Sequence, residues 1–163
     1  MHALEVIGQR KSVRRFTDEK VTKEQIQQLL EAARSAPSAG NRQPWFFYAI
    51  LNSELRSDLA KAAYGQSFVA QAPLVIVVCA EPERSAERYH DRGRTLYVYQ
   101  DTAAAVQNIL LAATAMGLGS CWVGAFDEEE VQKVMNLPQK LRPIALIPIG
   151  VPDTSRSFSR TSR

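Results

Sequence analysis

The chain has 163 residues, of which 45% are hydrophobic and 23% are charged, a composition typical of globular proteins. The 20 lysines and arginines, against 17 aspartates and glutamates, leave a net charge of +3, which is too small to favour nucleic acid as a partner. The longest apolar run, 74–80, is far shorter than the ~20 residues that a membrane helix requires. We therefore expect one domain over residues 1–163, without a membrane or nucleic-acid partner.

Signals for export, metal binding and hydrolysis are weak in this sequence. Residues 1–5 lack the layout of a signal peptide, so we expect a cytoplasmic protein. Cys79 and Cys121 form no Cys-x-x-Cys pair and have no histidine nearby, which argues against a metal site or a disulfide framework. The two histidines, His2 and His90, are not accompanied by a serine in a nucleophile-elbow pattern. A hydrolase is therefore disfavoured.

Two helices and two strands are predicted in the first half of the chain. The sequence 22–25 has the form of a capping box, and apolar residues follow it at helical spacing, which predicts a helix over 23–35. Leucines and alanines suggest a second helix at 55–63. The runs 45–51 and 74–80 are apolar and β-branched without polar interruption, which indicates strands covered on both faces.

A long helix and a last strand are predicted in the second half. The segment 97–116 has apolar residues at helical spacing and little charge, which indicates a helix in the core or in a subunit interface. Glycines at 117–119 end it, and a short apolar segment follows at 120–123. Asp127 is expected to cap another helix, and 144–151 to form the last strand. Because helices and strands alternate without a repeat or linker, the class is α+β or α/β.

The segment 10–14, called the Arg loop, lies at the start of a basic loop over 10–16. An extended backbone would project Arg10, Ser12 and Arg14 from one side, and two guanidinium groups with a hydroxyl suit a phosphate or a polyol. A solvated loop is the alternative. Further basic residues lie near the C-terminus, so the two basic termini either hold one anion together or are both solvated; these residues are Arg156, Arg160 and Arg163.

Two more loops combine small and polar residues. The Ser-Asn loop, residues 35–45, has small residues that permit close backbone approach and side chains that donate and accept hydrogen bonds, which suits the edge of a planar heterocycle. The Trp loop, residues 119–126, has glycines within an apolar segment, which indicates close approach of another group to the backbone. An ordinary helix-to-strand turn and tight packing are the respective alternatives.

Together these loops resemble those of the nitroreductase family of flavin enzymes, specifically its shorter members. The resemblance covers almost the whole chain in the family's order. It is carried by Arg-x-Ser-x-Arg at 10–14, Pro-Ser-x-x-Asn-x-Gln-Pro-Trp at 37–45, Gly-Leu-Gly-Ser-Cys-Trp-Val-Gly at 117–124 and Ile-Pro-Ile-Gly-Val-Pro at 147–152. It implies an α+β fold with α/β-type layers, in which a central, mainly antiparallel sheet is flanked by helices, and it implies a homodimer.

The resemblance also implies two FMN molecules at the dimer interface. One subunit would hold the phosphate and ribityl chain through Arg10, Lys11, Ser12, Arg14, Arg156 and Arg160. The other subunit would contribute Pro37, Ser38, Ala39 and Asn41. An amide of the backbone around Trp122, Val123 and Gly124 would bond the isoalloxazine near N5, and the Gln66 amide would contact the ring edge.

The sequence departs from the family pattern in two places. Val69 stands near the position where larger members carry a lysine that reaches the flavin. Family members usually continue past the final basic cluster with an acidic tail, whereas this sequence stops at Arg163. The polar segment 81–95 is a candidate lid over the ring; an exposed helix or a mobile loop is the alternative.

The implied activity is that of an FMN-dependent NAD(P)H oxidoreductase. NADH or NADPH would reduce FMN at N5 and leave, and a nitroaromatic, quinone or second flavin would then take the electrons in a ping-pong cycle. No catalytic side chain is expected, since the cofactor carries the chemistry. The alternatives are a flavin-binding redox or storage protein without nicotinamide turnover, a dehalogenase or enone reductase on the same fold, and a nucleic-acid module based on 157–163.

Overall fold

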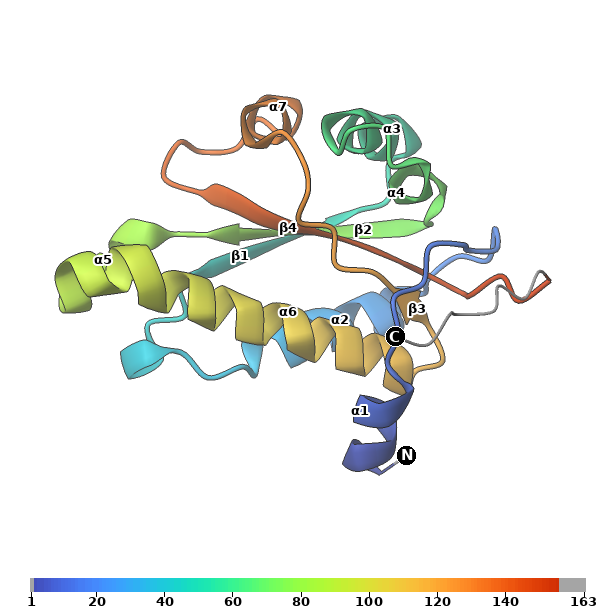
Figure 1. Ribbon diagram of the computed structural model, residues 1–163, viewed down its shortest axis with the longest axis horizontal. Coiled ribbons are helices and arrows are strands. Elements are labelled where there is room, and N and C mark those ends of the chain that lie inside the picture. The colour runs from blue at the N-terminus through green and yellow to red at the C-terminus, as the bar shows by residue number, and fades with distance from the viewer. Residues whose placement is uncertain (1, 156–163) are drawn as a thin grey trace, which may run out of the picture.

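The computed structural model describes residues 2–155 and shows a four-stranded sheet with helices on both faces (Figure 1). The strand order is β1-β2-β4-β3, and the paired strands are antiparallel. The strands are β1 (Trp45–Ile50), β2 (Leu74–Ala80), β3 (Gly119–Ser120) and β4 (Arg142–Gly150). The helices are α1 (Ala3–Gln9), α2 (Lys23–Arg34), α3 (Ser53–Ala62), α4 (Ser67–Gln71), α5 (Pro82–Arg92), α6 (Val98–Ala115) and α7 (Glu128–Val134), with short turns η1 (Ala39–Asn41) and η2 (Gly93–Tyr97). The predicted α+β class with a mainly antiparallel sheet is confirmed.

The two strands predicted to be covered on both faces differ in burial. Every residue of β2 is buried, because β1 and β4 flank it. β1 is an edge strand, in which Phe47 is half-buried and Ala49 is exposed. The prediction is therefore right for 74–80 and holds only in part for 45–51, since an edge strand is open to solvent along one side.

Each face of the sheet packs against its own helical layer. Side chains alternate along a strand. Ile76 of β2 therefore packs in one core cluster with Leu29 of α2 and Ile109 of α6. Val77 points to the other face and packs with Leu59 in the layer of α3, α4 and α7. Figure 1 shows these layers on opposite sides of the sheet. The other edge of β4 pairs with the two residues of β3 and, further along, with Val123 through an isolated bridge to Leu146.

The predicted helix ends are confirmed by their hydrogen bonds. The Thr22 N–H donates to Oε1 of Gln25 at 2.9 Å, and the Gln25 N–H donates to Oγ1 of Thr22 at 3.1 Å, which completes the capping box. Oδ1 of Asp127 accepts from the N–H of Glu130 at 3.0 Å. After α6 the chain turns at Gly117, whose φ of 74° favours glycine.

α6 is the core helix predicted over 97–116. Ala105, Ile109 and Ala113 are fully buried along it, and it lies against both the sheet and α2. Within the described residues, none of the helices is long and apolar enough to cross a membrane.

α1 was not predicted as a helix, and it extends away from the sheet in Figure 1. Leu4 is 72% exposed and Ile7 is 54% exposed on it. α1 therefore presents two large apolar side chains to solvent.

His90 holds a backbone conformation that is strained for a residue with a side chain. Its φ is 50° and its ψ is −135°, a region that glycine enters readily. The side chain is exposed. We expect His90→Gly to raise the free energy of unfolding by about 1 kcal/mol, which corresponds to roughly 2–4 °C in Tm, measured by circular dichroism. His90→Ala keeps the Cβ and should give no such gain; an equal gain in both variants would contradict the strain.

Candidate functional site

The Arg loop and the Trp loop meet at β3. The N–H of Val13 donates to the carbonyl oxygen of Ser120 at 2.8 Å, and Ser12 and Ser120 form an isolated parallel bridge. Gly119 permits this approach, because a Cβ there would lie 2.7 Å from Cγ1 of Val13. Two segments that are distant in the sequence therefore form one surface.

The polar side chains of the Arg loop lie around Cys121 of the Trp loop. Burial raises the pKa of the Cys121 thiol, while the charges of Arg14 and Arg10 and a hydrogen bond with the Ser12 side chain act to lower it. The Arg14 guanidinium carbon also lies 5.9 Å from the centroid of the Phe68 ring, within the range of a cation–π contact. The three side chains predicted to hold a phosphate therefore all act on one residue of the Trp loop, as their position on one side of an extended backbone predicts.

The Trp loop continues along the same edge of β4 beyond β3. The N–H groups of Cys121 and Val123 point toward β4, since they donate to its carbonyl oxygens at 3.3 and 2.9 Å. Successive N–H groups of an extended chain point in opposite directions, so those of Trp122 and Gly124 point away from the sheet. Neither has a hydrogen-bond partner within residues 2–155. They are donors that can reach a ligand lying against this edge.

The side chains of the Trp loop alternate in the same way. Cys121 and Val123 are buried, whereas Trp122 is 41% exposed and Gly124 is exposed. The N–H and the carbonyl oxygen of Val123 both bond to Leu146, so of the three residues predicted to face the ring, Trp122 and Gly124 are the ones that present free N–H groups within residues 2–155. Lys11, the remaining predicted ligand on the Arg loop, is exposed.

Gln66 lies directly beside the Trp loop. Its Nε2 donates to the carbonyl oxygen of Ala63 at 2.9 Å and to that of Ala125 at 3.0 Å. Both protons on Nε2 are engaged, so Gln66 would meet a ligand through Oε1, which accepts. Val69, one turn further along, is fully buried, so the position where larger family members carry a lysine is part of the core here.

The Ser-Asn loop lies toward the opposite end of α6 from β3 (cyan in Figure 1). The Ala39 N–H donates to the two carboxylate oxygens of Asp101 at 3.1 and 3.3 Å. α6 rises about 20 Å from Asp101 to Ala115, at roughly 1.5 Å per residue, and β3 follows shortly after. A single chain therefore joins the Arg and Trp loops but leaves the Ser-Asn loop apart from the Arg loop.

Side chains of the Ser-Asn loop hold it in a tight turn. Oγ of Ser38 accepts from the N–H of Gln43 at 2.9 Å, and Oδ1 of Asn41 accepts from Nε2 of Gln43 at 3.0 Å. Gly40 and Asn41 have φ values of 56° and 54°, which glycine and asparagine tolerate best. The four predicted ligands of this loop are exposed or half-buried: Pro37, Ser38, Ala39 and Asn41.

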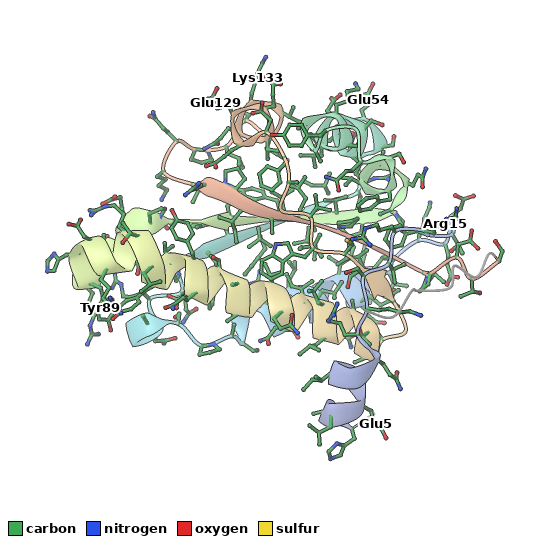
Figure 2. The ribbon with its side chains drawn as sticks, viewed as in Figure 1. Glu5, Arg15, Glu54, Tyr89, Glu129 and Lys133 are labelled. Atoms are coloured by element: carbon green, nitrogen blue, oxygen red, sulfur yellow. The ribbon has the colours of Figure 1, made fainter. Side chains whose placement is uncertain are left out.

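The segment 81–95 forms α5 and most of η2, a largely exposed helical stretch. It packs against the Ser-Asn loop, since Nε of Arg42 donates to the Arg84 carbonyl oxygen at 3.0 Å and the Arg42 guanidinium pairs with Glu87. Figure 2 shows Tyr89 at this end of the molecule, and its hydroxyl oxygen would lie 2.4 Å from a Cβ placed on Gly40. The segment is thus an exposed helix and not a loop, and its role as a lid over the ring stays a prediction.

Asp101 is a candidate functional residue that sequence reasoning missed. It is only 7% exposed, and burial raises the pKa of its carboxyl group, an effect that the hydrogen bond from Ala39 partly opposes. The sequence contains a feature that points to it, because Asp101 is the one charged residue of the otherwise uncharged helix α6. Carboxylates are rarely buried without a partner.

Arg156 and Arg160, which were predicted to join the Arg loop, lie outside the described residues. Within residues 2–155, no group of three or more histidine, cysteine, aspartate or glutamate side chains could hold a metal ion. The site described by the structure therefore consists of the guanidinium groups of the Arg loop, the outward N–H groups of the Trp loop and Oε1 of Gln66.

Comparison with known proteins identifies the family. The sequence model of the nitroreductase family matches residues 7–67 and 60–151. A provisionally named NADH dehydrogenase/NAD(P)H nitroreductase of Archaeoglobus fulgidus is 34% identical over 159 residues, which cover 95% of this chain and 88% of that protein. The crystal structure of a nitroreductase family protein from Clostridium novyi has a TM-score of 0.86 and 32% identity, covering 95% of this chain and 87% of that one. The NADPH:FMN oxidoreductase of Vibrio harveyi, solved in complex with NAD+, has a TM-score of 0.85 and 29% identity, covering 97% of this chain and 72% of that one. This chain therefore belongs to the nitroreductase family.

Proposed function

We propose that this protein is an FMN-dependent NAD(P)H oxidoreductase in which the whole chain forms one flavin-binding domain. The observation that carries the proposal is the shared surface of the Arg and Trp loops, where Val13 bonds Ser120 and where the charges of Arg10 and Arg14 act on the Cys121 thiol next to the outward N–H of Trp122. Family membership and the Vibrio harveyi relative, an NADPH:FMN oxidoreductase, support the same cofactor and electron donor.

The donor set fits FMN in both charge and shape. Arg10 and Arg14 would bind the phosphate, because a guanidinium group donates two parallel hydrogen bonds to an oxyanion, and Ser12 and Lys11 would bind the ribityl and phosphate oxygens. The outward N–H groups of the Trp loop would donate to the ring edge, where electron density increases on reduction. Oε1 of Gln66 would accept from a ring N–H.

A second copy of the chain would complete the site. The Ser-Asn loop lies about 20 Å along α6 from the end that leads to β3, so we propose that each subunit lends this loop to its partner's flavin. A groove of about 390 Å³ between α1, α2 and α6 is lined mainly by apolar residues, among them Ile7, Leu111 and Ala115. Together with the exposed Leu4, it forms an apolar surface suited to the interface of such a homodimer.

FMN would supply the redox chemistry, accepting a hydride equivalent at N5 from NADH or NADPH and passing electrons to a nitroaromatic, a quinone or another flavin in a ping-pong cycle. The residues of this chain would bind and orient the cofactor. The Arg loop fixes the phosphate end, and the Trp loop fixes the ring edge. Neither the reduction of FMN nor its reoxidation needs a side-chain acid or base. This agrees with a site that offers hydrogen-bond donors and positive charge.

The proposal is tested by flavin binding followed by anaerobic reduction. The purified protein should take up FMN and show absorbance near ~450 nm, and adding NADH or NADPH without oxygen should bleach it. Adding a nitroaromatic, a quinone or free FMN should then restore the absorbance. Folded protein that takes up no FMN would overturn the proposal, and bound FMN that neither nicotinamide reduces would favour a storage or redox-partner protein.

A further inference from the structure

The Asp101 carboxylate lies in an environment that does not favour charge. Ala105 and Thr102, on the same stretch of α6, are fully buried, and Asp101 itself is 7% exposed. In residues 2–155 its only hydrogen-bond partner is the N–H of Ala39, at 3.1 and 3.3 Å. A buried carboxylate is unfavourable unless it is hydrogen-bonded. The hydrogen bond with Ala39 therefore explains why an aspartate is tolerated at position 101.

The other polar contacts of the Ser-Asn loop stay within the loop or reach the start of α5, where the N–H of Glu81 donates to the Pro44 carbonyl oxygen at 2.9 Å and Nε of Arg42 donates to that of Arg84 at 3.0 Å. The bonds from Gln43 to Ser38 and to Asn41 stay within the loop, so they fix the turn without fixing its position. The pair between Arg42 and Glu87 is exposed, with 29% and 68% of the side chains accessible, and exposed ion pairs contribute little. Asp101 is therefore the buried side chain through which α6 holds the turn at Ala39.

We propose that Asp101 is a positioning residue for the flavin site of the partner subunit, because it fixes the Ser-Asn loop through the Ala39 N–H. This inference rests on the proposed function. α6 then has two tasks: its Asp101 end supports the loop lent to the partner, and its other end leads through Gly117 to β3, which supports the subunit's own Arg loop. Asp101 touches no flavin itself and acts through residues 38–41.

The first test compares Asp101→Ala with Asp101→Asn in full-length protein by titration with FMN. Asp101→Ala should weaken FMN binding about tenfold or more, the effect expected when a charge-assisted hydrogen bond that orders a binding loop is lost. Asp101→Asn keeps an acceptor at Oδ1 and should recover most of the affinity. Gln132→Ala is the matched control, since Nε2 of Gln132 donates to the Leu141 carbonyl oxygen at 2.6 Å on the opposite face of the sheet; it should lower Tm without changing the Kd for FMN.

Ala39→Pro removes the N–H that donates to Asp101 without altering α6. This variant replaces Asp101→Ala in the titration if Asp101→Ala does not fold. Ser38 is extended, with φ of −142° and ψ of 151°, and Ala39 begins η1; a proline fits after an extended residue and at the first helical position. It should weaken FMN binding as Asp101→Ala does. Wild-type protein that binds no FMN would overturn the proposed function. Wild-type affinity in folded Asp101→Ala or folded Ala39→Pro would overturn only the role of Asp101.

Mixed dimers test whether Asp101 acts on the partner's site. One subunit carries Asp101→Ala and the other carries Arg10→Gln with Arg14→Gln. If the Ser-Asn loop acts across the interface, both defects fall on one site and the other site is intact, so the mixed dimer should bind one FMN tightly. If the loop acts within its own subunit, each site has one defect and tight binding is lost. The second outcome would overturn the proposal.

Discussion

Gly119→Ala is expected to separate the Arg loop from β3 and to weaken FMN binding at least about tenfold. The added Cβ would lie 2.7, 2.8 and 2.9 Å from Cγ1, Cβ and Cγ2 of Val13, closer than carbon atoms can approach. Val13 cannot turn aside easily, because its side chain is β-branched and its N–H is bonded to Ser120. We also expect a loss of about 1–3 kcal/mol in the free energy of unfolding, measured by urea denaturation.

A compensating change and a control make this result specific. Val13→Gly in the Gly119→Ala background removes the three contacting carbons from the other side and should restore part of the FMN affinity. Gly8→Ala is the control, because a Cβ on Gly8 meets nothing within 4 Å and alanine favours the helix α1. If Gly119→Ala binds FMN like the wild type, the packing of Val13 on β3 does not set the position of the Arg loop.

Local signals predicted most of the fold. The capping box at Thr22 and the cap at Asp127 act within one helical turn, so sequence alone identifies them. The apolar run of β2 is equally clear, since every residue of the strand is buried. α4 has only five residues and is too short to show helical periodicity. α5 is rich in charge and is shaped by tertiary contact, as at Gly93, where a Cβ would lie 2.6 Å from the Ser85 carbonyl oxygen.

The candidate site divides in the same way. The sequence motifs predict the Arg and Trp loops, because small residues such as Gly119 are required where the two backbones meet and are visible in the sequence. The contact between Ala39 and Asp101 joins residues 62 positions apart, and no local pattern specifies it. Likewise, the sequence marks Gln66 as a polar contact, but only the fold shows that its Nε2 is bonded to Ala63 and Ala125.

Replacing Arg10 and Arg14 together by glutamine is expected to remove the preference for FMN over riboflavin. The two ligands differ only in the phosphate, and the Arg loop is the proposed phosphate site. Charge-assisted hydrogen bonds contribute roughly 1.5–3 kcal/mol each, so the Kd for FMN should rise by at least about a hundredfold, while the Kd for riboflavin should hardly change. Glutamine retains the stem as far as Cδ, but it lacks the guanidinium group of Arg14 that lies over the Phe68 ring, so riboflavin affinity also reports any effect of losing that contact.

The neighbouring Arg15→Gln provides the control, because an extended chain projects adjacent residues from opposite sides; Arg15 is labelled in Figure 2. It removes one positive charge from the same loop, so it reports how much a loss of charge by itself weakens the general attraction of the basic segment for anions. Long-range attraction also fades with salt, since charges beyond ~8 Å are screened at physiological ionic strength, whereas direct phosphate contacts keep much of their strength. Selective loss of FMN binding in the Arg10 and Arg14 variant at 0.3 M salt would therefore assign the phosphate to those two side chains. Equal weakening of FMN and riboflavin would instead show that the substitutions disturb the loop itself.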